Sequence, residues 1–413
     1  MPPVIVSQRK QMGRHVMDTD QAALRRWRWA SGTMFLANGF LMGSWAPQIP
    51  LLLPRHQITE STLGLLIFLL GVGAVGAMAL SGGLIARHGT RPVLRAFSVT
   101  ACVTLAGVVL APNLWVLSVT MVIMGALIGC MDVAMNANAV ELERRLGRAI
   151  MSSSHGFWSL GGFIGGIIGG WIIGQIGAEG HALVVAAATL GSVLLALAHL
   201  RGEPPASAHH AAKGGVKGWP RGAAIYILGL MAFCSMIPEG AVLDWAALYL
   251  QQEHGLGVST AGLAFALFSA TMAVMRFAGD AIRNRFGAVQ TLRISALIAA
   301  AGLTGAALAP NATLVIASFA FAGLGVANMV PVMFSAAGNF PGLSAGMGIS
   351  IVTMLGYSGI LVAPSSIGIV AEHIGFRVTF GTLALLLIAV ALMAGRAAAA
   401  DFTRSTGQTS AAT

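Results

Sequence analysis

The chain alternates long apolar stretches with short polar segments over most of its length. Each apolar stretch has about 20 to 28 residues, enough for an α-helix to cross a hydrocarbon core of about 30 Å. The pattern predicts twelve membrane-spanning helices, at residues 29–53, 61–86, 93–111, 114–141, 150–176, 182–200, 222–250, 260–283, 291–309, 312–338, 344–370 and 376–396. Residues 1–28 lack the short apolar core and cleavage site of a signal peptide, so no cleavable leader is expected there.

The two halves of the chain repeat each other in a fixed register of 198 residues. The matching segments are Ser61-Thr62-Leu63-Gly64-Leu65 with Ser259-Thr260-Ala261-Gly262-Leu263, Arg87-His88-Gly89 with Arg285-Phe286-Gly287, and Leu110-Ala111-Pro112-Asn113 with Leu308-Ala309-Pro310-Asn311. A gapless offset over so long a distance indicates that one multi-helix unit was used twice in the same orientation.

The repeat and the polar segments together predict the domain organisation. Two six-helix bundles are expected, at residues 29–200 and 222–396, with a cytoplasmic linker at 201–221 because that segment is polar and has no apolar periodicity. Residues 1–28 are expected to form a cytoplasmic tail, and 397–413 a disordered tail. The fold class is therefore an all-α integral membrane protein.

The composition is typical of a membrane protein, and the placement of the basic residues explains the positive net charge. Hydrophobic residues make up 56% of the chain and charged residues 9%, whereas soluble domains carry roughly 25% charge. The net charge of +10 gathers on one side of the predicted topology, and the other side keeps Arg55 and Arg377. This asymmetry follows the positive-inside rule, which predicts that both termini are cytoplasmic in the inner (plasma) membrane and makes a nucleic-acid partner unnecessary.

The reactive residues indicate neither a metal centre nor an enzyme. Cys102, Cys130 and Cys234 all fall inside predicted spans without paired spacing, and His209 and His210 lie in the polar linker. Paired catalytic acids, a nucleophile with a base, and an ATP-binding G-x-x-x-x-G-K-[ST] loop are all missing from the sequence. No cofactor is expected, and the partners are expected to be the bilayer, a small solute and H⁺, with the protein monomeric.

One short motif resembles a known family. Gly82-Gly83-Leu84-Ile85-Ala86-Arg87-His88-Gly89-Thr90-Arg91 resembles the loop between helices 2 and 3 of the major facilitator superfamily, G-x-L-A-D-R-x-G-R-K. In that family the acidic residue, replaced here by Ala86, helps to hold the cytoplasmic side closed. The resemblance implies a transporter of two parallel bundles, with Gly82, Arg87 and Gly89 serving the cytoplasmic turn and gate.

Further segments narrow the resemblance to the YbjJ and MosC-like branch, near the fucose-type symporters. These segments are Gly129-Cys130-Met131-Asp132-Val133-Ala134-Met135-Asn136, Met151-Ser152-Ser153-Ser154-His155-Gly156, Glu239-Gly240-Ala241, and Arg276-Phe277-Ala278-Gly279-Asp280. YbjJ has no assigned substrate, and MosC is associated with an inositol-derived amine, so the resemblance implies a small polar solute such as a sugar, cyclitol or amino sugar.

Motifs of proton-driven drug antiporters are missing from the chain. Their helix 4 carries an Arg four residues before a Gly, where this chain has Met121 before Gly125, and their helix 5 carries a Gly-Pro pair. Here the fifth predicted helix instead has glycine pairs every four residues, including Gly165-Gly166, which predicts close backbone packing against a neighbouring helix.

Acidic side chains at membrane depth are the candidates for chemistry. A carboxylate near the bilayer centre costs about 2.5 to 3.5 kcal/mol, so it needs a partner, a wet cavity or a function. Asp132 is the best candidate for proton coupling. Asn136 lies one turn further on the same face, which also carries Glu143, and His155 returns to the depth of Asn136. These four residues are expected to line the cytoplasmic half of a cavity.

The second half of the chain contributes further candidates. Glu239 follows Pro238, which favours a kink in the seventh helix, and is the second candidate for proton coupling. Asp244 is expected to serve gating or helix packing. Arg276 and Asp280 are spaced i, i+4, so we expect a local structural ion pair between them.

Polar stripes on several helices are expected to face one cavity. The expected substrate-binding residues are Asn38, Trp45, Asn136, His155, Asn328 and Tyr357, and Ser335, Asn339, Ser350 and Thr353 extend the stripes. Trp45 and Tyr357 suit stacking on the apolar face of a sugar ring. The sequence thus favours a proton-coupled, rocker-switch transporter of a small polar solute. A multidrug or metabolite exporter of the same fold and a non-transporting membrane sensor remain the alternatives.

Overall fold

The computed structural model describes residues 3–202, 220–256 and 263–401. Within these ranges the regular elements are all helices joined by short turns, and no strand is found there, which confirms the expected fold class. The elements are α1 (Pro3–Trp45), η1 (Ala46–Leu51), α2 (Leu52–His56), α3 (Glu60–His88), α4 (Thr90–Ala101), α5 (Thr104–Val109), α6 (Leu114–Leu146), α7 (Met151–Leu197), α9 (Ala223–His254), α11 (Leu263–Phe286), α12 (Ala288–Leu308), α13 (Ala312–Val326), α14 (Met329–Gly338), α15 (Ala345–Met393) and η2 (Ala394–Ala400).

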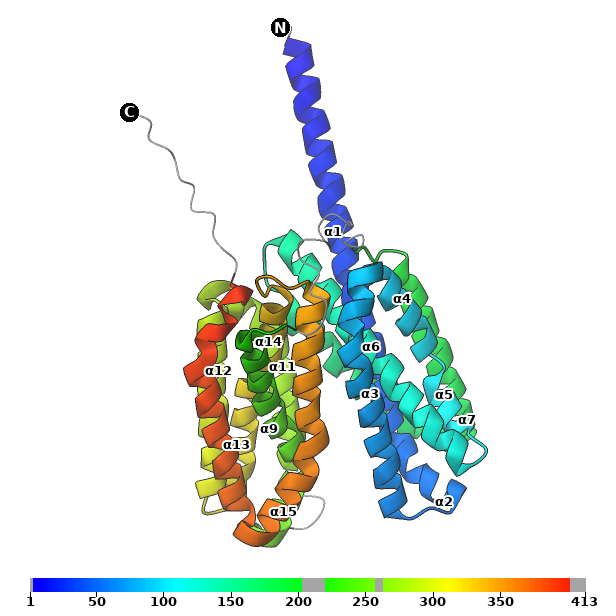
Figure 1. Ribbon diagram of the computed structural model, residues 1–413, viewed down its shortest axis with the longest axis vertical. Helices are drawn as coiled ribbons and strands as arrows, with labels where there is room; N and C mark the ends of the chain where they lie inside the picture. Colours follow the sequence, from blue (N-terminus) through cyan, green and yellow to red (C-terminus); the bar gives the residue numbers. More distant parts are fainter. Residues whose placement is uncertain (1–2, 203–219, 257–262, 402–413) are drawn as a thin grey trace.

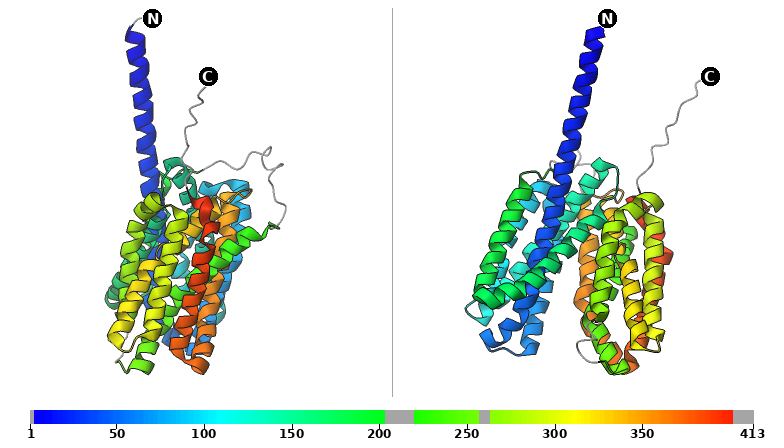
Figure 2. Two further views of the ribbon diagram at one scale, coloured as in Figure 1. Left: turned by 90° about the vertical axis from the view of Figure 1, so that its left-hand side faces the viewer. Right: turned by 180° about the vertical axis from the view of Figure 1, so that it is seen from behind.

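The helices form two bundles side by side. Figures 1 and 2 show α1 to α7 in one bundle and α9 to α15 in the other, with both chain ends on the same side of the molecule. We call that side the terminal end. The bundles meet where α15 packs against α3 and α6 and where α11 packs against α7. The expected linker, 201–221, falls almost entirely outside the described residues.

Ten helical segments of the described chain are long and apolar enough to cross a bilayer. The expected spans 29–53 and 150–176 are not among them as separate segments, although α1 and the first half of α7 are helical there. The second of these expected spans is covered in part, because the apolar segment Ile168–Leu197 includes its last residues. The count of twelve therefore stays a prediction.

Matching caps begin and end the helices of the two halves. Asn113 accepts a hydrogen bond from the Val116 amide at 3.0 Å, and Asn311 accepts one from the Leu314 amide at 3.0 Å. Each side chain thereby satisfies an amide that the first turn of a helix leaves free. The offset of 198 residues predicted from the sequence is thus preserved in the geometry of the helix starts.

The glycines of α7 pack against α1 at backbone distance. A Cβ at Gly165 would lie 2.5 Å from the Phe40 carbonyl oxygen and 2.7 Å from the Ser44 amide, and one at Gly161 would meet the Leu36 carbonyl. The predicted close packing is confirmed at these positions. At Gly166 a Cβ would only come within 3.8 Å of the Gly43 carbonyl, so the two members of this pair are not equivalent.

The segments outside the bundles differ from the expected tails. Helix α1 begins at Pro3, so residues of the expected N-terminal tail are helical. At the other end, η2 buries Ala397 and Ala400, and the Asp401 carboxylate accepts a hydrogen bond from the Ala288 amide. The expectation of disorder from residue 397 is therefore wrong as far as Asp401, because these residues pack on the start of α12. Residues 402–413 lie outside the described chain.

Candidate functional site

Five polar side chains meet where the two bundles face each other. They are Asp132 on α6, His155 on α7, Glu239 on α9, Arg276 on α11 and Tyr357 on α15, and we call them the polar cluster. The Tyr357 side chain interacts with Asp132, Glu239 and Arg276, and His155 also lies within electrostatic reach of Arg276. Residues from both halves of the chain therefore form one site.

Asp132 is the most deeply placed acid of the polar cluster. Its side chain is only 3% exposed, and its Oδ2 atom has no hydrogen-bond partner among the described residues. Tyr357, from the other bundle, lies within interaction range of the carboxyl group. Asn136 does not serve this carboxyl group, because its amide donates to the Asp132 backbone carbonyl at 2.9 Å.

Asn136 and His155 lie at the same depth, as their sequence positions predict. The His155 Nε2 atom and the Asn136 Oδ1 atom are 3.1 Å apart. The His155 ring also packs against Phe35 and Phe334, with centroid distances of 5.3 and 5.7 Å. The imidazole is therefore held in one orientation beside Asn136.

Arg276 links three helices across the bundle boundary. Its side chain is 6% exposed and donates to Ser159 Oγ on α7 at 2.5 Å and to Glu239 on α9 at 3.4 Å. The expected ion pair with Asp280 is wrong. The Asp280 carboxylate instead accepts hydrogen bonds from the Ser152 and Ser153 amides, at 2.9 and 3.0 Å. The free amides of the first turn of α7 attract this carboxylate more effectively than a neighbour on its own helix.

Glu143 does not line a cavity, which corrects the sequence-based expectation. Its side chain is fully buried and pairs with Arg283 at 2.9 and 3.0 Å, and it also accepts from the Ile150 amide at 2.9 Å and from the Ser335 hydroxyl. Arg283 and Ser335 belong to the other bundle. A buried ion pair with two hydrogen bonds across the boundary holds the two bundles together at this point.

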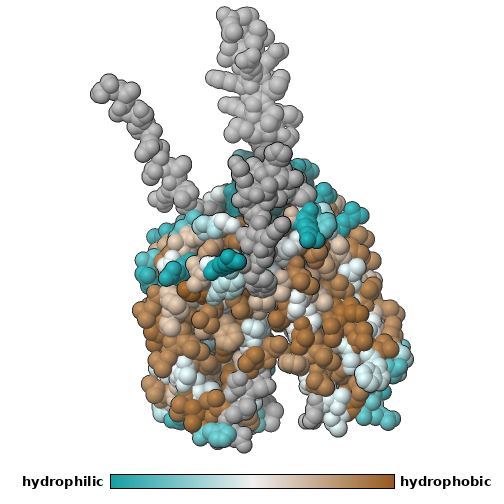
Figure 3. Space-filling model, in the orientation of Figure 1, coloured by the Kyte–Doolittle hydropathy of each residue, from teal (hydrophilic) through white to brown (hydrophobic). Residues whose placement is uncertain are grey.

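A second arginine extends this contact. Arg144 donates to Asn339 Oδ1 at 2.5 Å and to the Gly338 carbonyl. We call Glu143, Arg144, Arg283 and Ser335 the terminal gate, because they lie at the terminal end. The sequence offered no signal for it, since its partners lie 140 to 195 positions apart. Figure 3 shows the surface hollowed between the bundles at the opposite end.

The loop motif of the first half contributes little to the terminal gate. Ala86 and Arg87 are exposed. Gly89 supports the turn into α4 with a φ of 82°, and a Cβ at Gly82 would lie 2.8 Å from the Met347 Cα of α15. The equivalent motif of the second half does contact the other bundle. Asn284, the counterpart of Ala86, accepts a hydrogen bond from the Ala149 amide at 2.7 Å.

The remaining candidates are dispersed. Asn38 accepts from Trp158 Nε1 at 2.9 Å, and Asn328 is buried with no hydrogen-bond partner for its Oδ1 atom among the described residues. Trp45 is buried at the end of α1. Asp244 is exposed on α9, and its side chain makes no hydrogen bond or ion pair with the described residues. The described residues also contain no group of three side chains suited to a metal.

The comparison with protein families decides the identity of the fold. The model of the Major Facilitator Superfamily matches residues 32–225 and 228–412. The chain belongs to the major facilitator superfamily. It is therefore a multi-pass membrane transporter of that superfamily, and its two bundles are the two halves of the superfamily fold.

Relatives within the superfamily cover most of the chain. An uncharacterized MFS-type transporter of Yersinia pestis is 34% identical over 365 residues, 87% of this chain and 93% of its own length. Membrane protein MosC of Rhizobium meliloti is 30% identical over 363 residues, 87% of this chain and 86% of its own. The resemblance to MosC predicted from sequence motifs is confirmed.

Solved structures of the superfamily share the fold. The human organic anion transporter MFSD10 has a TM-score of 0.72 at 15% identity and covers 90% of this chain and 99% of its own. The E. coli fucose:proton symporter FucP has a TM-score of 0.69 at 20% identity and covers 89% and 98%. In this superfamily fold the polar cluster stands between the two bundles, where substrates bind when a transporter is built from repeats.

Proposed function

We propose that this superfamily member is a secondary active transporter that moves a small polar solute together with protons. The observation that carries the proposal is Asp132, a buried carboxyl group whose Oδ2 atom has no hydrogen-bond partner among the described residues and which lies within interaction range of Tyr357 of the opposite bundle. A carboxylate at membrane depth is costly unless it is paired, hydrated or protonated. A change in its surroundings as the bundles move is therefore coupled to binding or release of a proton.

The side chains around Asp132 favour a hydroxylated solute. Asn136 and His155 supply hydrogen-bonding groups without net charge, and Arg276 with Glu239 adds one cation and one anion. A sugar, a cyclitol or an amino sugar offers several hydroxyl groups to such a site. The likeness of the fold to FucP, a fucose:proton symporter, supports this class of substrate.

The two ends of the molecule support transport by alternating access. The terminal gate joins the bundles through Glu143 and Arg283, and the opposite end is hollowed. Breaking the first contact and closing the second end would move the access route from one side of the membrane to the other. The distribution of arginine favours an inner membrane location with both termini in the cytoplasm.

The proposal is tested by flux in proteoliposomes containing the full chain. We expect labelled myo-inositol, L-fucose or glucosamine to accumulate when the lumen is alkaline relative to the bath, and accumulation to disappear when an ionophore collapses the pH gradient. Accumulation of lipophilic cations under the opposite gradient, with an acidic lumen, would instead identify a proton-coupled exporter. Binding of these solutes without flux in any direction would identify a sensor and overturn the proposal.

A further inference from the structure

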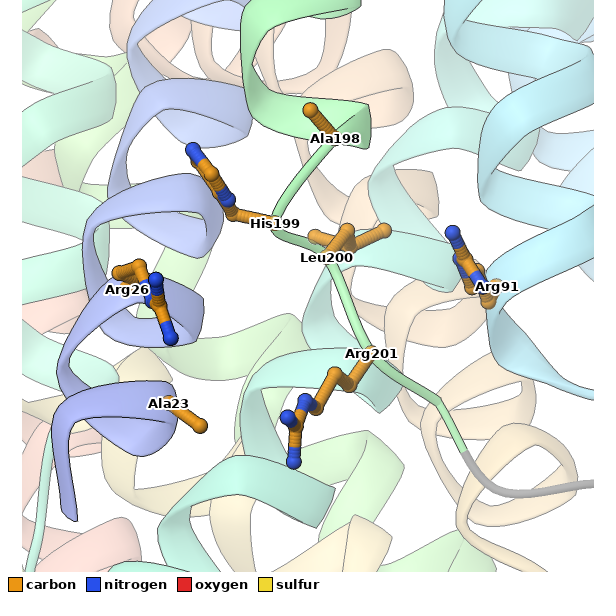
Figure 4. Close-up of a pocket in the computed structure, with 7 residues that line it drawn as sticks. All are labelled: Ala23, Arg26, Arg91, Ala198, His199, Leu200 and Arg201. Carbon is orange, nitrogen blue, oxygen red and sulfur yellow. The ribbon is translucent and has the colours of Figure 1, made fainter. Parts of the chain in front are cut away.

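A basic cavity lies at the terminal end of the first bundle, apart from the polar cluster. It has a volume of about 290 Å³ and is lined by Ala23, Arg26, Arg91, Ala198, His199, Leu200 and Arg201. Figure 4 shows that three elements supply its arginines: α1 carries Arg26, α4 carries Arg91, and Arg201 follows α7. A neighbouring cavity of about 320 Å³ shares Arg91 and Arg201.

The three arginines have no acidic partner in the described part of the chain. No acidic residue lines the first cavity. Glu141 in the neighbouring cavity pairs with Arg145 at 3.7 Å and accepts from the Thr90 hydroxyl at 3.2 Å. Three guanidinium groups around one cavity favour an anion, and guanidinium donors match the oxygen atoms of a phosphate group.

Buried side chains hold the backbone of the cavity in place at Arg201. The Arg201 carbonyl accepts a hydrogen bond from Asn138 Nδ2 at 2.6 Å, and Asn138 Oδ1 accepts from Trp27 Nε1 at 2.9 Å. Asn138 and Trp27 are each 1% exposed. The segment after α7 therefore returns to a defined place beside α1 and α4, which makes the cavity a built feature of the bundle.

Exposed leucines lie next to the cavity. Leu194 and Leu195 of α7 lie one turn before Ala198 and His199, which follow the end of α7 and line the cavity, and they are 54% and 74% exposed. A ligand with a phosphate group in the cavity could therefore lay apolar chains along this face. We propose that the cavity binds the phosphate headgroup of an anionic phospholipid. Free inorganic phosphate has the same phosphate oxygen atoms, but it has no apolar chain that could pack on the exposed leucines.

The test measures lipid affinity in the double variant Arg91→Gln/Arg201→Gln. Phosphatidylglycerol, phosphatidylcholine and inorganic phosphate are titrated separately into the full chain in uncharged detergent, and thermal unfolding is followed. We expect stabilisation of the wild type by phosphatidylglycerol alone. The variant should bind it more weakly by about a factor of five for each arginine removed.

The matched control is Arg285→Gln/Arg396→Gln, which removes the same charge from exposed positions at the terminal end of the other bundle. It should keep the affinity of the wild type. Equal weakening in both double variants would show a diffuse effect of net charge and overturn the proposed site. Equal stabilisation by inorganic phosphate and phosphatidylglycerol would assign the cavity to a soluble anion and overturn the lipid as its ligand. If the double variant does not fold, Arg26→Gln alone tests the same cavity from α1.

Discussion

Gly177 and Gly375 stand 198 residues apart and have nearly the same left-handed backbone. Gly177 has φ 76° and ψ 174°, and Gly375 has φ 81° and ψ 160°. Each interrupts a long helix, α7 or α15, at the end opposite the chain termini, and a residue with a side chain adopts such a conformation only under strain. In each bundle, the chain therefore reverses direction between the fifth and sixth predicted spans at a glycine with positive φ.

Replacing Asp132 separates coupling from binding. We expect Asp132→Asn to abolish accumulation driven by a pH gradient, because the titrating group is lost while shape and hydrogen bonding are largely kept. Counterflow exchange of the same solute, which needs no net proton movement, should largely survive. Equal loss in both assays, or no loss in either, would exclude Asp132 from coupling and direct attention to Glu239.

Double-mutant cycles can measure how strongly Arg276 interacts with each of its two candidate partners. We expect Arg276→Gln and Glu239→Gln to show a coupling energy of about 1 kcal/mol in the free energy of unfolding, because the two side chains are in contact. The cycle of Arg276→Gln with Asp280→Asn is the control and should be additive within about 0.5 kcal/mol. Strong coupling in the control cycle would instead indicate that Arg276 forms a local ion pair with Asp280.

Weakening the terminal gate should open the terminal end. In Glu143→Gln the buried Arg283 loses its counter-charge, a change that costs about 3 to 5 kcal/mol in buried pairs. Labelling of a cysteine introduced at the buried Ala336, in a chain without Cys102, Cys130 and Cys234, should then accelerate. Arg285→Gln, exposed and outside the gate, should leave the labelling rate unchanged. An unchanged rate in Glu143→Gln would show that this contact does not keep the end closed.

The glycine pair of α7 offers a matched comparison of packing. Gly165→Ala places a methyl group against the backbone of α1 and should lower stability by about 1 to 3 kcal/mol, as overpacking does. Gly166→Ala meets ordinary contact distances and should be tolerated. Thermal unfolding of both variants with the wild type distinguishes them, and equal stability would mean that the seam between α1 and α7 relaxes freely.

A reporter fusion can test the predicted orientation of the chain in the membrane. Because arginine and lysine collect on one side of the predicted topology, a reporter inserted within residues 203–218 should be cytoplasmic. A fluorescent protein should therefore mature there, and alkaline phosphatase should stay inactive. Active phosphatase at this position would refute the predicted order of spans.

Local patterns in the sequence predicted the scaffold and part of the polar cluster. Apolar length predicted the helices, and the register of α6 and α7 predicted the contact of Asn136 with His155. The partners of charged side chains were not predictable in the same way. The i, i+4 spacing of Arg276 and Asp280 is a property of one helix, and the side chains chose partners on other helices.

Glu143 illustrates the same difficulty at the terminal gate. Its helical face predicted a place beside Asp132, but Arg283 lies 140 positions later and draws the carboxylate into a buried pair. Such a pairing depends on how the two bundles dock, and nothing in the neighbourhood of residue 143 in the sequence encodes that. The predicted tail after residue 397 failed for a similar reason, because its contacts lie on α12.

The duplicated scaffold carries chemistry that is not duplicated. At the repeat position of Asp132 the chain has Val330, and at that of Arg276 it has Met78. One wall between the bundles therefore carries the carboxyl group of Asp132, and the other carries a guanidinium group paired with Glu239, in a frame built by duplication. The two walls are chemically different. A polar ring bound between them would have two unequal orientations, so the site would hold it one way round.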